Sequence, residues 1–395
     1  VSKIEMIRSL NLVLIPNKEQ EKYLKNACGT ARWAYNFALG CKNDYYDRYN
    51  QNLKGGYIRK RITEMKNEME EYSWLKDISN NVTKQAVKDC DRAFLNFFRG
   101  KARHPKFKKK GRSKESFYVE KIKFIRVGNQ LYVKIEKLKQ PILLSKEATK
   151  YKNIENVEGI FNNPRIKFNG RRWEISFSIK FREPIKELTE EVIGIDLGIT
   201  NTAICSNGRI YKNINKTSNK LKRLEKRKKK TQRRISKKYE MNKQGGKFNK
   251  TNNIIKEEKK LSRINHTISN IRKDYNHKIS KDIVNELPRA IVMENLNVRG
   301  MMKNKHLARA IQEQNFYTLL TFIKYKAESQ GTKFIQVPRN FKSTQLCSKC
   351  GDEYKIRLSE RTYQCSSCGL EIDRDLNSAL NLRNYGLNHL NSQTA

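Results

Sequence analysis

The sequence lacks the apolar segments that membrane insertion or secretion would require. It contains no run of 18 or more apolar residues, and a membrane-spanning helix needs a run of about that length. A short apolar stretch near the start is interrupted by Asn11, whereas a signal peptide carries a longer one with a small-residue cleavage site. We therefore expect no membrane partner and a reducing, cytosolic environment for the eight cysteines.

Acidic residues are scarce relative to basic ones. The 395 residues include 84 Lys and Arg but only 40 Asp and Glu, which gives a formal net charge of +44. A folded body with this charge repels itself unless a polyanion neutralises it, and the pattern favours nucleic acid as that polyanion. With 37% hydrophobic residues, the length is enough for two or three packed domains. Charge alone leaves open whether the protein is a structural nucleic-acid binder or an enzyme.

The first quarter of the chain predicts one strand followed by helices. Apolar residues alternate over residues 7–15, which predicts a strand. Asn17 and Gln20 then form the pattern of a capping box at the start of a helix. Apolar residues recur at helical spacing after this cap, so helices are expected from residue 17 to about residue 98.

A small β domain is expected after these helices. Residues 115–183 alternate with a period of two, as strands do. Gly128-Asn129 and Asn169-Gly170 lie between alternating runs and predict hairpin turns of two residues each. The early strand has no β partner nearby in the sequence, so we expect it to join this later sheet, with the helices as an insertion.

The second half of the chain mixes strands and helices, which predicts a multidomain α/β protein. The run "EEVIGIDLGITNTAIC" predicts a hairpin around "DLGITN", and "AIVMENL" and "KFIQV" predict two further strands. A long polar helical region is expected over residues 213–286 and another helix over residues 307–330.

Two strongly basic segments are candidates for contact with nucleic-acid phosphates. Residues 99–114 hold nine Lys or Arg and no acid, and Pro105 and Gly111 make a loop the expected structure. Residues 220–238 hold twelve Lys or Arg and one acid. The alternative is that both are solvated surface segments. The candidate contacts are Lys106, Lys108, Lys109, Lys110, Arg112, Arg223, Arg227, Arg233, Arg234 and, farther along, Arg361.

Four cysteines have the spacing of a zinc site. Cys347, Cys350, Cys365 and Cys368 form the pattern C-x2-C-x14-C-x2-C, and a Gly follows the second Cys of each pair. Each pair can bind one side of a metal ion, and four thiolates favour structural Zn²⁺. The remaining four cysteines are isolated in the sequence and are expected to be ordinary thiols.

Three acids stand out because each ends or follows an apolar run. Asp196 ends "VIGID", Glu294 ends "AIVME", and Asp375 lies at the expected start of a helix. Three carboxylates that converge from separate elements could hold two Mg²⁺ ions for phosphodiester cleavage. The alternatives are solvated acids at strand ends and, for Asp375, a helix N-cap. Asp373 lies close enough in the sequence to compete with Asp375 for either role.

The motifs around these acids resemble those of the TnpB family of transposon-encoded proteins. "GIDLGITNTA", "IVMENLNV" and "STQLCSKCG…RTYQCSSCG…DRDLNSALNL" look like the three RuvC-type nuclease motifs of that family, with a zinc ribbon before the third. "LIPNKEQEKYLKNACGTARWAYNFAL" and "HPKFKKKGRSKESFYV" resemble its N-terminal segment and basic loop. The resemblance implies an RNA-guided DNA endonuclease in which Asp196, Glu294 and Asp375 are catalytic and bind two Mg²⁺, and the four cysteines bind structural Zn²⁺.

The resemblance also implies an architecture. The expected parts are an RNase H-like RuvC core with an inserted zinc ribbon, a β-barrel wedge-type domain and a helical recognition lobe. The corresponding ranges are 1–16 with 115–188 for the wedge-type domain, 17–114 for the recognition domain, 189–342 with 371–395 for the RuvC domain, and 343–370 for the ribbon, which would contact target nucleic acid.

The family implies partners as well as a fold. They are a guide RNA from the transposon end and double-stranded target DNA that carries a short flanking motif, bound by a monomer in the bacterial or archaeal cytoplasm, at the nucleoid. Three alternatives remain open: a catalytically silent RNA-guided repressor, a compact type V CRISPR effector, and a transposase or resolvase that uses no RNA. The ribbon could form a flap over the cleft or merely brace the fold.

Overall fold

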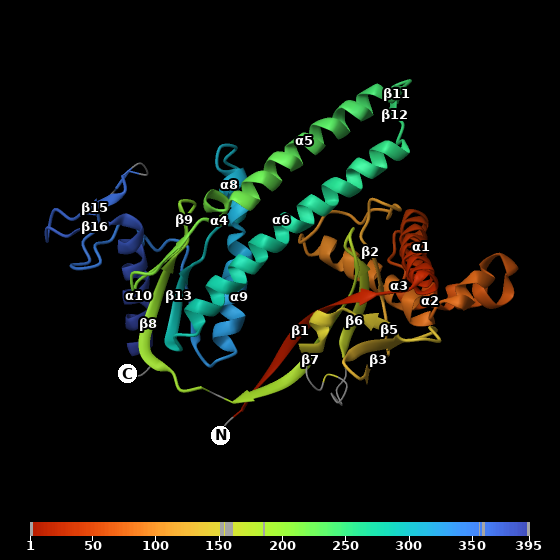
Figure 1. Cartoon of the computed structure of the whole chain (residues 1–395), viewed down its shortest axis with the longest axis horizontal. Coiled ribbons are helices and arrows are strands. Elements are labelled where there is room, and N and C mark those ends of the chain that lie inside the picture. The colour runs from red at the N-terminus through yellow and green to blue at the C-terminus, as the bar shows by residue number, and fades with distance from the viewer. Residues whose placement is uncertain are drawn as a thin grey trace. The chain divides into compact units, whose positions relative to one another are not determined.

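The chain folds into two compact units, residues 7–181 and residues 182–395 with 1–6 (Figure 1). The computed structural model describes residues 3–150, 154, 161–184, 186–354, 356–357 and 360–392. Parts of the predicted wedge-type, RuvC and ribbon ranges lie outside the described residues. None of the helices in the described ranges is long and apolar enough to cross a membrane.

The unit of residues 7–181 combines helices with one sheet. Its helices are α1 (Lys18–Tyr49), α2 (Gly55–Glu68), α3 (Asn80–Phe98) and the 3-10 helices η1 (Glu70–Asp77) and η2 (Lys146–Lys150). Its strands are β1 (Lys3–Ile15), β2 (Glu115–Tyr118), β3 (Ile122–Val127), β4 (Gln130–Ile135), β5 (Ile142–Leu144), β6 (Asn162–Phe168) and β7 (Trp173–Pro184). The seven strands form one sheet in the order β2-β6-β7-β1-β5-β4-β3. Closure of this sheet into a barrel stays a prediction.

The early strand joins the later sheet, as the sequence predicts. β1 pairs with β5 in antiparallel register, with Leu14 opposite Leu144. The predicted capping box at the start of α1 is confirmed, because the Asn17 side chain accepts a hydrogen bond from the backbone N–H of Gln20 and the Gln20 side chain accepts one from the backbone N–H of Asn17. Helices and sheet share a single hydrophobic core, so the helical insertion is packed against the β part rather than separate from it.

One predicted hairpin turn is confirmed and the other is longer than predicted. β3 and β4 are joined by a turn at Gly128 and Asn129. Between β6 and β7, however, Phe168 pairs with Trp173, so that four residues form the turn. The Asn169 side chain accepts hydrogen bonds from the backbone N–H groups of the third and fourth turn residues. These bonds stabilise the wider turn, which an Asn-Gly pair alone does not predict.

The unit of residues 182–395 is built on a mixed sheet. Its main strands are β8 (Thr189–Asp196), β9 (Asn201–Cys205), β10 (Ile210–Lys212), β13 (Pro288–Glu294) and β14 (Lys333–Val337). They are ordered β10-β9-β8-β13-β14. β8, β13 and β14 run parallel, while β9 and β10 are antiparallel to their neighbours. The predicted hairpin around "DLGITN" is β8 and β9.

Helices cover both faces of this sheet (Figure 1). They are α4 (Ile214–Thr217), α5 (Asn219–Met241), α6 (Asn252–Val284), α7 (Val298–Met301), α8 (Ala308–Gln314), α9 (Phe316–Glu328) and α10 (Arg374–Asn391). Alternate residues of β13 face opposite sides. Ala290 and Val292 pack in the cluster with α10, whereas Ile291 and Met293 pack with α6 and α9.

The predicted helical stretches are each divided in two. Residues 213–286 form mainly α5 and α6, which pair through Leu221, Ile264 and Ile268. The short strands β11 (Lys243–Gln244) and β12 (Lys247–Phe248) join them. The single helix predicted over residues 307–330 was wrong, because Asn315 adopts a left-handed conformation with φ of 55° and separates α8 from α9. Asn tolerates this conformation better than most residues.

α10 lies unusually close to the sheet because glycines occupy the contact. A Cβ atom on Gly194 of β8 would overlap the carbonyl oxygen of Ala379 and the backbone nitrogen of Arg383 in α10. In the reverse direction, a Cβ on Gly386 of α10 would overlap the side chain of Val292. Backbone therefore packs directly against backbone where α10 crosses β8.

We expect the substitution Gly194→Ala to lower the free energy of unfolding by about 1–3 kcal/mol, because overpacking a close contact with rigid backbone costs that much. The matched control is Gly40→Ala in α1, where a Cβ would meet no atom within 4 Å. This control should stabilise the chain by about 0.5–1 kcal/mol through helix propensity. Denaturant unfolding followed by circular dichroism measures both. Equal stability of the Gly194→Ala variant and the wild type would contradict the close contact.

Candidate metal centres

The four cysteines form the first candidate metal centre. Their sulfur atoms all lie within 4.8 Å of one another. Cys347 Sγ is 3.6 Å from Cys368 Sγ, and Cys350 Sγ is 3.6 Å from Cys365 Sγ. Tetrahedral Zn²⁺ with Zn–S bonds of about 2.3 Å requires sulfur atoms about 3.8 Å apart. The observed spacing fits that geometry, and a disulfide at about 2.05 Å is excluded.

Tight turns place both cysteine pairs. Gly351 and Gly369 adopt positive φ of 81° and 68°, as the turn after each pair requires. Their N–H groups donate to the carbonyl oxygens of Cys347 and Cys365 respectively. Burial raises the pKa of Cys347, but backbone N–H groups of Cys350 and Lys349 outweigh it and lower this pKa to about 7. A thiolate, which zinc requires, is thereby favoured at this position.

A short hairpin connects the cysteines to α10. The strands β15 (Thr362–Gln364) and β16 (Glu371–Asp373) pair in antiparallel register, and β16 runs directly into α10. Tyr363 between the two cysteine pairs is fully buried, and its hydroxyl donates to the Gln345 carbonyl oxygen. The hairpin that holds the second cysteine pair is therefore continuous with the helix that carries Asp375.

The second candidate centre lies where two parallel strands end. Asp196 is the last residue of β8 and Glu294 is the last residue of β13. Ile195 pairs with Met293 in this parallel register, so the two acids are neighbours on adjacent strands, whose spacing is about 4.8 Å. Both belong to the alternating set that faces α10, as Gly194 and Val292 do. Carboxylates from two strands thus converge under the helix.

α10 contributes the third acid and decides between two neighbours. The Asp373 side chain accepts hydrogen bonds from the backbone N–H groups of Asp375 and Leu376, so Asp373 is the helix N-cap. Asp375 lies in the first turn of the helix, with a side chain that is 15% exposed. The N-cap alternative for Asp375 was therefore wrong. After burial and Glu294, the Asp375 charge contributes to the raised pKa of Asp196 at the end of β8.

The three acids interact electrostatically. The pKa of Asp196 is raised well above its usual value, first by burial and then by the charges of Glu294 and Asp375. The Ser378 hydroxyl, one turn along α10, lies close enough to oppose this shift. It is buried and forms no well-aligned hydrogen bond with the residues that the structure describes. The site therefore holds a carboxylate that is costly to ionise and a buried hydroxyl without a well-formed partner.

Glu294 has one specific partner. Burial raises its pKa, and a hydrogen bond from the Ser343 hydroxyl opposes the shift. Ser343 is 2% exposed and comes from the start of the zinc ribbon. No signal in the sequence marks Ser343, because its role depends on a contact between segments 49 residues apart.

Two arginines hold Asp375 on its outer side. The Arg374 guanidinium lies 3.0 Å from the Asp375 carboxylate, and Arg361 Nη1 lies 3.5 Å from it. Arg361 also donates to the Thr200 hydroxyl in the loop that follows Asp196. Among the residues that the structure describes, only the four cysteines form a group of three or more side chains whose ligand atoms lie close enough to hold one metal ion. The three acids affect one another electrostatically but do not form such a group.

The predicted phosphate contacts are nearly all on the surface. The exception is Lys108, whose ammonium lies 3.6 Å from the centre of the Tyr35 ring and whose backbone bonds to Asn36. Burial lowers the pKa of Lys108. Its position indicates that Lys108 anchors the basic loop to α1. The candidates at least partly open to solvent are Lys106, Lys109, Lys110, Arg112, Arg223, Arg227, Arg233, Arg234 and Arg361.

α5 carries a groove lined only by cations. Its volume is about 520 Å³. Arg233 and Arg234 were predicted to contact phosphate, and four lysines that the sequence did not single out lie beside them. All the lining residues come from α5 and are Lys226, Lys229, Lys230, Arg233, Arg234 and Lys237. A concave surface lined by cations alone concentrates positive potential and suits a phosphate backbone.

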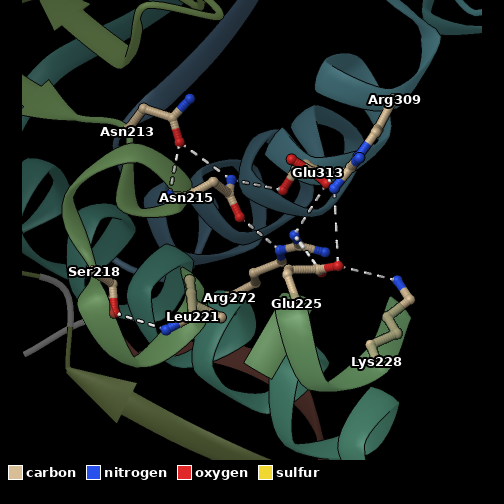
Figure 2. Close-up of polar contacts among 9 residues, drawn as sticks. All are labelled: Asn213, Asn215, Ser218, Leu221, Glu225, Lys228, Arg272, Arg309 and Glu313. Carbon is tan, nitrogen blue, oxygen red and sulfur yellow. Dashed lines mark hydrogen bonds and ion pairs between the residues drawn. The ribbon is translucent and has the colours of Figure 1, made fainter. Parts of the chain in front are cut away.

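The acids near α5 are used internally. Glu225, the one acid in the basic stretch, is contacted by Arg272, Arg309 and Lys228 (Figure 2). Glu313 of α8 also pairs with Arg272 and Arg309. These contacts tie α5, α6 and α8 together at the base of the helical hairpin. The carboxylate of Glu225 is thereby paired with cations outside the groove.

The same network reaches the loop that follows Asp196. Arg272 donates to Asn215, which in turn contacts Asn213 (Figure 2). Asn213 donates to the Ile199 carbonyl oxygen. Gln314 of α8 donates to that same carbonyl at 3.1 Å. The loop of residues 197–200 is therefore held from two sides, which fixes where β8 ends and where Asp196 lies.

Comparison with known proteins agrees with these features. Three family profiles match the chain: "Helix-turn-helix domain" over residues 6–51, "Probable transposase" of the OrfB_IS605 type over residues 176–305, and "Cas12f1-like, TNB domain" over residues 316–382. InsQ of Escherichia coli K12, named as a candidate RNA-guided DNA endonuclease, is 27% identical over 96% of this chain and 92% of its own length. TnpB-like protein L79 of Acanthamoeba polyphaga mimivirus is 30% identical over 36% of this chain and 30% of its own length.

The chain is thus similar to curated RNA-guided DNA endonucleases and TnpB-like proteins. Its fold agrees with that similarity. It resembles Cas12f1 in the solved complex with sgRNA and target DNA, with a TM-score of 0.56 and 15% identity over 96% of this chain and 99% of that one. At this identity the likeness concerns the fold alone, a mixed α/β arrangement.

The four-cysteine cluster leads to a metal-content prediction. Wild-type protein should contain about one Zn²⁺ per chain, and Cys350→Ala should lose it and unfold at a lower temperature, because structural zinc contributes folding free energy. Cys41→Ala is the matched control, since Cys41 lies outside the cysteine cluster. Elemental analysis and thermal unfolding measure both effects. Full zinc content in Cys350→Ala would contradict the assignment.

The raised pKa of Asp196 leads to a second prediction, measured first on zinc-loaded protein without added Mg²⁺. A raised folded-state pKa costs stability above the unfolded value of about 4, and the cost disappears as the pH falls below it. We expect Asp196→Asn to melt several degrees above the wild type at pH 8, with a difference that shrinks at pH 5. Adding Mg²⁺ should raise the melting temperature of the wild type but not of the variant. A variant no more stable than the wild type at pH 8 would refute this account.

Proposed function

We propose that this protein is a TnpB-type RNA-guided DNA endonuclease of a transposable element, which cuts target DNA beside a short flanking motif. Asp196, Glu294 and Asp375 would form its catalytic centre. The observation that carries the proposal is the convergence of these three acids, from two parallel strand ends and one helix, in a protein of net charge +44. Basic residues outnumber acidic ones about two to one in this chain. Three acids gathered at the carboxyl ends of two strands and the start of a helix therefore require a reason.

The proposal also assigns a residue range and a role to each domain. The strand order β10-β9-β8-β13-β14, with helices on both faces, supports an RNase H-like RuvC core. The proposed ranges are 1–16 with 115–188 for a wedge-type domain, 17–114 for helical recognition, 189–342 with 371–395 for the RuvC nuclease, and 343–370 for a zinc ribbon that contacts target nucleic acid.

Two Mg²⁺ ions fit the acid site. Its donors are carboxylate oxygens, which Mg²⁺ prefers, and the buried Ser378 hydroxyl has no well-formed partner among the described residues. Burial, followed by the charges of Glu294 and Asp375, raises the pKa of Asp196, so a cation bound here would offset a cost that the fold otherwise bears. When bound, Mg²⁺ would supply Lewis-acid polarisation of the phosphodiester and activation of the attacking water.

The residues around the acids have complementary tasks. Ser343 would hold the Glu294 carboxylate through its hydrogen bond. Arg361 and Arg374, now paired with Asp375, are placed to exchange that partner for a DNA phosphate. The interactions of Asn213 and Gln314 with Ile199 would keep the end of β8 fixed while DNA binds.

The basic surfaces would bind the guide RNA and the target DNA. The lining of the six-cation groove on α5 includes no acid, and neither does the basic loop of residues 99–114. Such surfaces bind the phosphate backbone without reading sequence, which suits a protein whose sequence specificity comes from guide pairing. We propose a monomer that acts in the cytoplasm at the nucleoid.

A compact type V CRISPR effector is the second candidate, because the "Cas12f1-like, TNB domain" profile matches the ribbon region. The two candidates share the chemistry and differ in the origin of the guide. A silent repressor is disfavoured because all three acids are present and interact. Sequencing of the RNA that copurifies with the protein separates transposon-end from repeat-array guides.

The cleavage test compares two acids that lie two residues apart. With its copurified RNA, the wild type should cut matched DNA in Mg²⁺, and Asp375→Asn should lose at least ~100-fold in rate, since metal-assisted hydrolysis depends on several kcal/mol of charge stabilisation. Asp196→Ala should behave in the same way.

Asp373→Asn is the matched control, because Asn also serves as a helix N-cap and this carboxylate is occupied with the backbone of α10. It should cut at nearly the wild-type rate. Retention of cutting by Asp375→Asn with loss in Asp373→Asn would reverse the assignment. Absence of cutting by the wild type with bound RNA would favour the repressor.

A further inference from the structure

The zinc ribbon meets the acid site through a segment of six residues. Residues 343–348, called here the anchoring segment, run alongside α10 to the first zinc ligand. At its start, the Ser343 hydroxyl donates a hydrogen bond to Glu294 Oε1. Near its other end, Cys347 is a zinc ligand candidate that is 2% exposed. One short segment therefore touches both metal centres.

Three asparagines of α10 hold the backbone of the anchoring segment. Asn381 Nδ2 donates to the carbonyl oxygens of Ser343 at 2.8 Å and Leu346 at 2.6 Å. Asn377 Nδ2 donates to the Leu346 carbonyl at 2.7 Å. These side-chain hydrogen bonds add to the backbone pairing of the segment with residues 352–354.

The asparagines recur on one face of the helix. Asn377, Asn381 and Asn384 follow the spacing i, i+4 and i+7, which places them in one row. The Asn377 side chain also accepts the backbone N–H of Ser348 at 3.0 Å, and Asn384 donates to the Ser348 carbonyl at 3.1 Å. Asn is a poor residue for a helix interior, and two of the three are at least 95% buried. The free-energy cost of placing asparagines in the helix is offset by the hydrogen bonds that they form with the anchoring segment.

We propose that Ser343 is a positioning residue for Glu294, and that the asparagine row sets Ser343 in place from the zinc-bound segment. The zinc centre then acts on the acid site at a distance. It fixes Cys347, the asparagines register the backbone of residues 343–348 on α10, and Ser343 orients one carboxylate oxygen of Glu294. This inference rests on the proposed function, because it takes Glu294 as a ligand of the catalytic cation.

The proposal separates two roles of the ribbon that the sequence left open. If the ribbon only braces the fold, loss of the Ser343 hydroxyl changes stability and nothing else. If Ser343 orients Glu294, loss of the hydroxyl weakens cation binding while the fold and zinc content stay the same. Partners of a metal-ligating carboxylate typically change metal affinity by about 10–100-fold, which is large enough to measure.

The experiment titrates the full-length, RNA-free protein with Mn²⁺ as a paramagnetic probe for the acid site, using electron paramagnetic resonance. Ser343→Ala should weaken Mn²⁺ binding by at least ~10-fold, and Ser343→Thr, which keeps the hydroxyl, should restore affinity to within a few-fold of the wild type. Ser348→Ala is the matched control, because its contacts with the asparagine row use only backbone atoms. Zinc content and melting temperature are recorded for each variant.

Two further variants keep the test decisive if Ser343→Ala folds poorly. Asn381→Ala and Cys350→Ala leave Ser343 and the three acids in the sequence, and both should weaken Mn²⁺ binding if the segment transmits position. Wild-type Mn²⁺ affinity in Ser343→Ala, or in Cys350→Ala that has lost its zinc, would overturn the inference and leave the proposed function standing.

The failure of the proposed function has a different signature. In that case the wild type would bind Mn²⁺ no more tightly than Asp196→Asn does, and the inference would fall with it. Cleavage assays on the RNA-loaded protein provide the second readout: the Mg²⁺ concentration for half-maximal rate should rise in Ser343→Ala, with the affinity for target DNA unchanged.

Discussion

The architecture of the unit that carries the acid site depends on the close packing of α10 against β8 and β13. Glycine at positions 194 and 386 lets helix and strands approach until backbone meets backbone. That approach brings Asp375 and Ser378 to the carboxyl ends of the two strands, where Asp196 and Glu294 lie. A larger residue at the contact would separate the helix from the sheet and the acids with it. A packing constraint therefore sets the geometry of a charged site.

Placing three acidic side chains close together at a buried site costs folding free energy. Three carboxylates share a partly dry space, and burial together with mutual repulsion raises the pKa of Asp196. Such an arrangement persists only if something else in the structure over-determines it. Here α10 is held by the glycine contacts, by its Asp373 cap and by the asparagine row that binds residues 343–348. A divalent cation would convert the repulsion into binding energy.

Charge is distributed differently in the rest of the unit. Acids outside the acid site are often used internally, as Glu225 and Glu313 are by Arg272 and Arg309. The consequence is that α5 presents to the solvent a groove lined by cations alone. The Glu225 network also supports the loop after Asp196 through Asn213 and Gln314. The surface that suits nucleic acid and the site that suits a metal pair thus share one framework.

Features that depend on local chemistry could be predicted from the amino-acid sequence. Cysteine spacing gives a metal site because each C-x2-C pair needs only its own turn. An acid after an apolar run marks a strand end, and Asn17 with Gln20 marks a helix start, since both signals lie within a few residues. Net charge and the overall α/β character follow from composition and periodicity.

Features that depend on contacts between distant segments became visible in the tertiary structure alone. It chose Asp373 as the cap and left Asp375 to face the other acids, turned Lys108 inward onto Tyr35, broke the helix at Asn315, and brought Ser343 to Glu294. Each of these outcomes depends on which surfaces pack together, and side-chain spacing along a chain carries no record of that.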